Sequence, residues 1–153
     1  MIVVSDTSAI TSLIQVGRIR LLADLFTTVL VPPAVERELR VLHAHLPAFI
    51  QIRPVAETAT LLRLCGEIHR GEAEAIVLAK ETSADVLLID ERVGRAVARR
   101  EGVAIIGLVG VCLTAKRAGL LDEVGPLLDE LERQAQFRIS PGLKAQALRS
   151  VGE

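Results

Sequence analysis

Two carboxylates of this 153-residue chain stand where strands of a buried parallel sheet are expected to end. Asp6 follows the apolar run 2–4, and Asp90 follows the apolar run 86–89. Short branched apolar runs that each lead into a helical pattern are typical of parallel strands, and functional side chains collect beyond the carboxyl ends of such strands. Neighbouring strands lie roughly 5 Å apart, so the two carboxylates would reach one ion. Asp6 alone is as well explained as a helix N-cap, because its carboxylate can accept backbone N–H groups of the first turn.

Two glutamates are expected on the inward sides of helices. Glu38 borders the apolar face of a predicted helix over 33–43, and Glu72 heads the apolar face of a predicted helix over 71–80. Glu74, in the same helix as Glu72, is expected on a flank. An inward-facing carboxylate is unfavourable unless a partner or a cation neutralises its charge.

Together these residues predict an acidic metal site. Clustered carboxylates repel one another, and a divalent cation removes that repulsion. An all-oxygen site favours Mg²⁺ or Mn²⁺ over zinc, and such an ion can activate water and neutralise charge on a phosphate under attack. The predicted catalytic set is Asp6, Glu38, Glu72 and Asp90, with Asp6, Glu72 and Asp90 as metal ligands.

Other chemistries find less support in the sequence. There is no glycine-rich phosphate loop of the dinucleotide or P-loop form. Asp6 is not followed two residues later by a second Asp, which argues against an aspartyl-phosphate phosphatase. The three histidines, His43, His45 and His69, show no ligand spacing and are predicted to lie on the surface. Both cysteines are expected to be buried and inert.

Composition bounds the class of protein. Half the residues are hydrophobic, 24% are charged and the formal net charge is −1, so the chain is globular and any basic surface must be local. Trp and Tyr are absent, which disfavours an aromatic platform for stacking bases. No secretory leader precedes the first apolar run, and no apolar run approaches the roughly 20 residues of a membrane span. We expect a cytoplasmic protein.

Alternating strand and helix patterns predict an α/β fold, a three-layer α/β/α sandwich around a mostly parallel central sheet. Strands are expected over the opening run, 28–31, 86–89 and 103–106, with 49–53 as a further candidate. Helices are expected over 7–15, 18–26, 33–43, 56–67, 71–80, 91–101, 109–118, 121–135 and 141–150.

These features resemble a PIN domain, the nuclease fold of VapC-type toxins. The resemblance rests on Asp6-Thr7-Ser8 after a strand, Val35-x-x-Glu38-Leu39, Gly71-Glu72-x-x-Ala75-Ile76-x-Leu78-Ala79 and a strand ending at Asp90. A prokaryotic subfamily of predicted nucleic-acid-binding PIN proteins is similar further on, at Asp90-Glu91-x-x-Gly94-Arg95-x-x-Ala98, Gly107-x-x-Gly110, Ala115-Lys116-x-x-Gly119 and Phe137-Arg-Ile-Ser-Pro141. The resemblance covers nearly the whole chain, as a single PIN-like domain over 1–153 in which 137–153 is a C-terminal extension packing on the domain or on a partner.

The resemblance implies a Mg²⁺- or Mn²⁺-dependent endoribonuclease that uses the same four acids, with Thr7 or Ser8 assisting. It also implies a homodimer and, for the toxin of a type II toxin–antitoxin pair, a cognate antitoxin protein. The chain departs from the toxin pattern in having Leu108 where Thr is usual and Glu72 where Asp is usual. Asp90 can align with a hydroxyl position of the toxins, which makes Glu91 the rival fourth acid.

A basic stripe is predicted beside the acids. Arg92, Arg95 and Arg99 share one face of the helix after Asp90, and Lys116 extends it, so they would bind RNA phosphates. An ordinary solvated face explains the same spacing equally well. The alternative to the ribonuclease is a non-catalytic PIN-fold module that binds nucleic acid or protein, and a small α/β phosphatase is a third reading.

Overall fold

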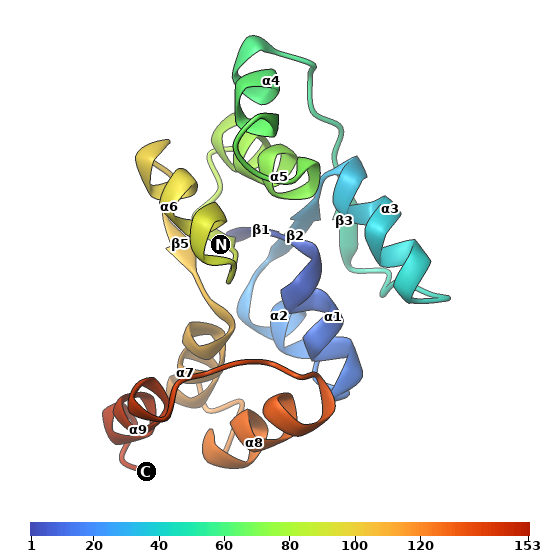
Figure 1. Ribbon diagram of the computed structural model, residues 1–153. Helices are drawn as coiled ribbons and strands as arrows, with labels where there is room; N and C mark the ends of the chain where they lie inside the picture. The colour runs from blue at the N-terminus through green and yellow to red at the C-terminus, as the bar shows by residue number, and fades with distance from the viewer.

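The computed structural model describes residues 1–153 and shows one five-stranded sheet with helices on both faces (Figure 1). All strand pairs are parallel, and the strand order is β3-β2-β1-β4-β5. The strands are β1 (Ile2–Ser5), β2 (Thr28–Val31), β3 (Ile50–Ile52), β4 (Val86–Leu88) and β5 (Ile105–Ile106). This arrangement confirms the predicted three-layer α/β/α fold.

The helices cover the sheet in two groups. They are α1 (Thr7–Gln15), α2 (Arg20–Leu25), α3 (Pro33–Leu42), α4 (Ala59–Cys65), α5 (Arg70–Glu81), α6 (Arg92–Arg100), α7 (Leu108–Arg117), α8 (Gly125–Gln134) and α9 (Pro141–Ser150). In Figure 1, α4, α5 and α6 lie above the sheet, while α1, α2, α7 and α8 lie below it. Helix α3 contacts both α1 and α5 at the β3 side of the sheet. None of the helices is both long and apolar enough to cross a membrane.

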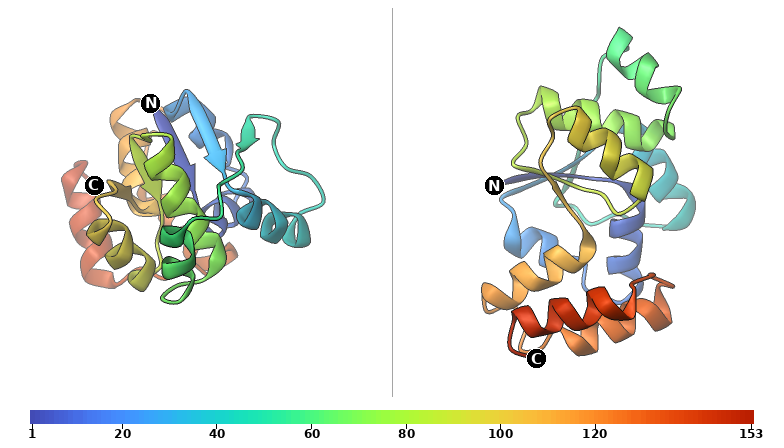
Figure 2. Two further views of the ribbon diagram at one scale, coloured as in Figure 1. Left: turned by 90° about the horizontal axis from the view of Figure 1, so that it is seen from above. Right: turned by 60° about the vertical axis from the view of Figure 1, so that its left-hand side comes forward.

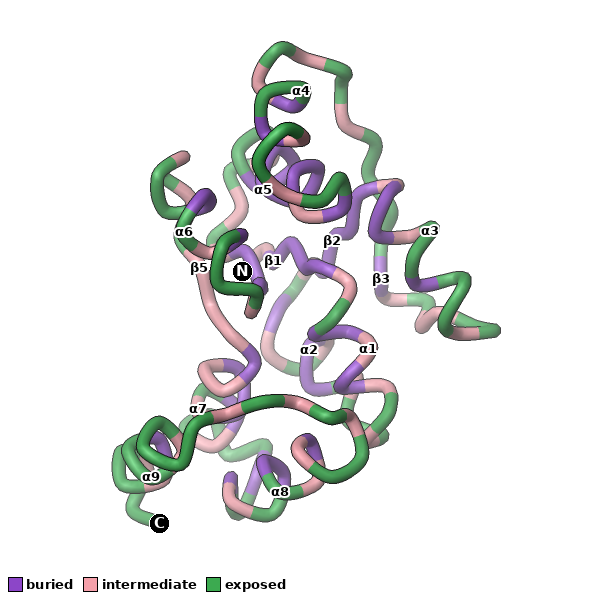
Figure 3. The backbone as a smooth tube through the Cα atoms, viewed as in Figure 1, coloured by how far each residue is buried: buried purple, intermediate pink, exposed green.

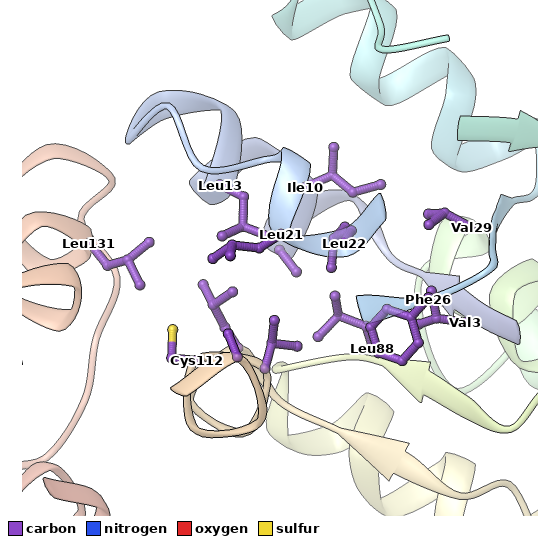
Figure 4. Packing of buried hydrophobic residues seen from close by; sticks show 14 of the residues in the cluster. Val3, Ile10, Leu13, Leu21, Leu22, Phe26, Val29, Leu88, Cys112 and Leu131 are labelled. Carbon is purple, nitrogen blue, oxygen red and sulfur yellow. The ribbon is translucent and has the colours of Figure 1, made fainter. Parts of the chain in front are cut away.

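Strand alternation divides the buried side chains into two cores, because successive residues of a strand point to opposite faces. Val3 and Leu88 belong to a cluster of 22 buried residues on the α1, α2, α7 and α8 side, part of which Figure 4 shows. Val4 and Leu87 belong to a cluster of 14 on the α4, α5 and α6 side. Because both faces are covered, the central strands read as continuous apolar runs, and Figure 3 shows them buried.

Strand β1 lies at the centre of the sheet, and its pairing carries Asp6 to the site. Val3 pairs with Val29 of β2 on one side and with Val86 of β4 on the other. The ladder continues past β1, where the Asp6 backbone N–H donates to the Leu88 carbonyl at 3.1 Å. The expected proximity of the β1 and β4 ends is therefore confirmed.

Residues 137–153 fold back onto the rest of the chain. An extended stretch leads into α9, which lies beside α8 (Figure 2). The Lys144 ammonium contacts both Asp129 and Glu132 of α8. The Glu153 carboxylate accepts hydrogen bonds from the backbone N–H groups of Val124, at 2.8 Å, and of Gly125, at 2.9 Å, at the start of α8.

Some element boundaries differ from the sequence prediction. The strand expected over 103–106 is reduced to β5, because the Val103 N–H donates to the Ala98 carbonyl and so ends α6. Helix α8 begins at Gly125 rather than at 121, with its first N–H groups bound by Glu153. Cys112 is fully buried as expected, and burial raises the pKa of its thiol to about 12. Cys65 is only half-buried.

Candidate active site

Asp6 is fixed at the carboxyl end of β1 as the N-cap of α1. Its Oδ1 accepts the Ala9 backbone N–H at 3.3 Å, and the Ser8 hydroxyl lies 3.3 Å from Oδ2. The residue is only 4% exposed. Burial raises the pKa of the Asp6 carboxyl to about 7; the charges of Asp90 and Glu72 act in the same direction, while the Ala9 and Ser8 hydrogen bonds oppose the shift. Asp6 can therefore be both the N-cap of α1 and a residue of the site, because the capping hydrogen bond orients its carboxylate.

Glu72 projects from the first turn of α5 with one carboxylate oxygen unsatisfied. Its Oε2 is buried and has no hydrogen-bond partner. Burial, and next the charge of Glu91, raise the pKa of the Glu72 carboxyl. A buried acceptor without a partner costs on the order of 1–3 kcal/mol, more when it is charged. A ligand that binds this oxygen would therefore offset the cost.

Two glycines let the backbone approach these acids. A Cβ added to Gly94 of α6 would lie 2.3 Å from the Glu72 Oε2, and one added to Gly71 would lie 2.9 Å from the Glu38 Oε1. Both glycines are inside or at the start of helices, where glycine is about 1 kcal/mol less favourable than alanine. Close packing against carboxylates explains why glycine occupies these positions.

Glu38 closes the other side of the site. It is exposed on α3, and the Thr7 hydroxyl donates a hydrogen bond to its Oε2. Thr7 follows Asp6 directly, so this contact joins the start of α1 to α3. Thr7 thus orients an acid of the site.

The acids line one cavity of about 220 Å³. None of its eight lining residues is hydrophobic; they are Asp6, Thr7, Ser8, Glu38, His69, Gly71, Glu72 and Glu91. We call it the acidic pocket. It gathers three of the four predicted acids, with both hydroxyls that the family resemblance named.

The side chains of Asp90 and Glu91, at the end of β4, point in different directions. The Asp90 carboxylate turns toward α7 and accepts the Leu108 backbone N–H at 3.0 Å, and it lies outside the lining of the acidic pocket. Burial raises the pKa of Asp90, although the Leu108 hydrogen bond and the nearby Arg95 oppose this. Glu91 lines the acidic pocket and caps α6 by accepting the Gly94 N–H at 2.7 Å, which lowers the pKa of its carboxyl. The rival fourth acid is therefore the one in the pocket.

The predicted basic stripe is divided between different environments. Arg92 and Arg99 are exposed on α6 and form no ion pair. Arg95 is partly buried, and its guanidinium donates to the Ile89 carbonyl at 2.8 Å. Lys116 lies on α7, where its ammonium contacts the Asp122 carbonyl and the Glu153 carboxylate.

His69 lines the acidic pocket, although it is not among the site residues predicted from the sequence. It is exposed, as predicted, at the N-cap position of α5, three residues before Glu72. Its charged form lowers the pKa of both Glu72 and Glu91. Its position beside a Gly-Glu pair at a helix start is the only clue that the chain offers.

The donor chemistry of the acidic pocket suits a hard divalent cation. It supplies carboxylate and hydroxyl oxygens, one of them an orphaned buried oxygen, and two of its acids have raised pKa values. In their present positions, no three Asp, Glu, His or Cys side chains surround a common point closely enough to hold a metal ion. An ion held by three of these side chains would therefore require side chains of the pocket to move.

Comparison with known proteins agrees with this architecture. A family model, DUF3368, described as a PIN domain, matches residues 2–153. No curated protein matches the chain. The match confirms the family resemblance, while the toxin role stays a prediction.

Proposed function

Because the chain belongs to the PIN-domain family, which has a nuclease-type fold, we propose that it is a metal-dependent endoribonuclease. The observation that carries the proposal is the partnerless buried oxygen of Glu72 in a pocket with no hydrophobic lining. Asp6 and Glu72 would hold Mg²⁺ or Mn²⁺, with Glu91 as the third carboxylate. Asp90 contributes through its charge, which favours a cation near Asp6.

A bound divalent cation would supply water activation and would neutralise charge on the phosphate during hydrolysis. The protein itself supplies orientation. Backbone and Ser8 contacts hold the Asp6 carboxylate, and the Thr7 hydroxyl holds Glu38 at the opposite wall. The unpaired guanidinium groups of Arg92 and Arg99 lie on the helix that Glu91 caps, where they would attract flanking phosphates of the RNA.

Cleavage of a single-stranded RNA in Mg²⁺ or Mn²⁺ tests the proposal. The wild-type protein is expected to cut, and Asp6→Asn and Glu72→Gln each to lower the rate by about a hundredfold or more, a loss typical of removing one electrostatic group from an active site. Glu81→Gln is the matched control, because Glu81 is exposed on the same helix as Glu72 and forms no hydrogen bond. Pure wild-type protein that cuts no RNA with either metal would contradict the proposal.

The toxin role follows from the family resemblance and has its own test. A toxin should arrest growth on expression, Asp6→Asn should not, and a cognate antitoxin should relieve the arrest. A homodimer is proposed on the same basis, and sedimentation at micromolar concentration measures it. If the protein sediments as a monomer, the homodimer proposal is refuted, while the nuclease proposal is unaffected.

A second candidate function, a non-catalytic module that binds RNA, is favoured by the engagement of two acids with backbone groups. Asp90 is bound by Leu108 and Glu91 by Gly94, and no three side chains of the site converge. Such a module would bind RNA equally well in chelator and would show no metal-dependent change in melting temperature. The nuclease requires a metal-dependent change that Glu72→Gln removes.

A further inference from the structure

A second cavity of different character lies beside the acidic pocket. This side groove has a volume of about 410 Å³ and lies between the loop joining α4 to α5 and the first turn of α6. Its lining is Cys65, Gly66, Glu67, Ile68, His69, Glu72, Glu91 and Val93. Three of these residues, His69, Glu72 and Glu91, also line the acidic pocket, so the two cavities are adjacent.

The walls of the side groove are partly apolar and carry no lysine or arginine. Three lining residues are hydrophobic, against none in the acidic pocket. Val93 is 52% exposed at the start of α6, with its side chain on this wall. A surface without cations does not attract phosphate, whereas an apolar wall suits the face of a flat ring.

We propose that the side groove binds an unpaired nucleobase of the RNA, that of the nucleotide next to the scissile phosphate. The inference rests on the proposed nuclease function and names the form of its substrate. The base face lies against Val93 and Ile68, and the lining residues shared with the acidic pocket place its phosphate near Glu72. A base in a duplex cannot enter, because it is stacked and paired.

The polar groups of the side groove also favour particular bases. Both Glu67 oxygens accept hydrogen bonds from Arg100, at 2.7 and 2.6 Å, and this contact lowers the pKa of the carboxyl. A Glu67 carboxylate that pairs with Arg100 can only accept hydrogen bonds. Adenine, cytosine and guanine carry an exocyclic amino donor, whereas the base of uridine offers only its ring N3–H, so we expect uracil to bind least well.

An abasic scan of a short RNA with a mapped cut site tests the base contact. Removing the base on one side of the cut is expected to lower kcat/KM about tenfold, a loss typical of one stacked base. Val93→Ala should lower kcat/KM for the intact RNA and leave the abasic RNA unaffected. Leu62→Ala is the matched control, because Leu62 is 59% exposed on the neighbouring α4 and lies outside the groove. Equal losses for intact and abasic RNA in Val93→Ala overturn the proposal.

Alkylation of Cys65 gives a readout that does not depend on cleavage. Cys65 lines the groove, while Cys112 is fully buried and serves as an internal reference. In Asp6→Asn protein with Mg²⁺, the intact RNA should slow alkylation of Cys65, and the RNA abasic at the mapped position should not. Equal protection by both, or by neither, overturns the side-groove proposal. If wild-type protein cuts no RNA, the same experiment uses short RNAs that are abasic at each position in turn, and protection that one of these removes would keep the groove and refute the nuclease.

Discussion

Glu72 and Glu74 lie two residues apart on α5 and meet opposite environments. Glu74 is 2% exposed, and both its oxygens are bound, Oε1 by the Ala34 N–H at 3.0 Å and Oε2 by the Arg70 Nε at 2.7 Å. Glu72 keeps a buried oxygen with no partner. One carboxylate is thus part of the structure that joins α5 to α3, and the other is the one that we propose binds the metal ion.

The difference teaches how to tell a structural carboxylate from a functional one. Burial alone does not separate them, because the fully satisfied Glu74 is the more buried. What separates them is the supply of protein donors, since a structural acid has its charge neutralised within the fold. The predictions below test this contrast in order of expected size.

The largest effect on stability is expected from truncating Glu74, whose two carboxylate oxygens both have hydrogen-bond partners. Glu74→Ala removes the acceptor of a buried N–H at the start of α3 and should lower the free energy of unfolding by about 3 kcal/mol. Glu72→Ala should change it by less than about 1 kcal/mol, because the buried Oε2 has no hydrogen-bond partner to lose. Urea unfolding in chelator measures both. An equal loss of unfolding free energy in the two variants would mean that Glu72 and Glu74 do not differ in their structural role.

Asp6 is expected to make the metal-free protein less stable as pH rises. Its pKa of about 7 in the fold lies above the ordinary value of 3.8, so the folded state holds an additional proton between these values. Stability therefore falls from about pH 4 to about pH 7, and the full penalty is present above pH 7. Asp6→Asn keeps the capping oxygen and removes the charge, so it should be more stable than wild type at pH 8.

The measurement is denaturant unfolding at several pH values between 4 and 8. The advantage of Asp6→Asn over wild type should grow across this range, with Asp24→Asn, an exposed acid on α2, as the control. A constant difference between Asp6→Asn and wild type would mean that Asp6 does not titrate in this range.

Gly94→Ala tests whether the space beside Glu72 is required. The added methyl group would displace the Glu72 carboxylate or push α6 away, which should cost about 1–2 kcal/mol of stability and lower metal affinity. Gly142→Ala on α9 meets nothing within 4 Å and should be neutral or stabilise by roughly 0.5–1 kcal/mol. Thermal unfolding with and without Mg²⁺ compares the pair. Unchanged metal binding in Gly94→Ala would show that the close approach is incidental.

The smallest effect expected is that of the metal itself on stability. At a Mg²⁺ concentration about ten times its dissociation constant, the folded protein should gain about 1.4 kcal/mol, which raises the melting temperature by a few degrees. Glu72→Ala should abolish this gain and Glu81→Ala should not. A rise that persists in Glu72→Ala would place the ion elsewhere.

Much of the site could be predicted from local patterns. Asp6 ends an apolar run before a helix, and Glu72 heads a helix whose apolar face is clear, so periodicity sufficed to select both. Asp90 and Glu91 could not be separated in this way, because adjacent residues at a strand end are divided by which backbone N–H each accepts. That choice depends on where α7 begins.

Other features depended on contacts between distant parts of the chain. The sequence placed Glu74 on a flank, and the structure shows this was wrong: its partner Ala34 lies 40 residues away, at the start of α3. His69 enters the lining only because α6 packs across the loop before α5. Helical spacing predicted Arg92, Arg95 and Arg99 as one set, but the carbonyl at Ile89 binds Arg95.

The central place of β1 has a consequence for the order in which the molecule folds. Val3 pairs with Val29 and also with Val86, so one side of the strand is completed by a segment more than 80 residues further along. Pairings over such separations close late, because the entropy of a long loop must be overcome before the contact stabilises it. During synthesis on the ribosome, Asp6 would leave the exit tunnel long before β4 and α6. The nascent chain would then carry an incomplete acidic pocket until more than half of the chain had emerged.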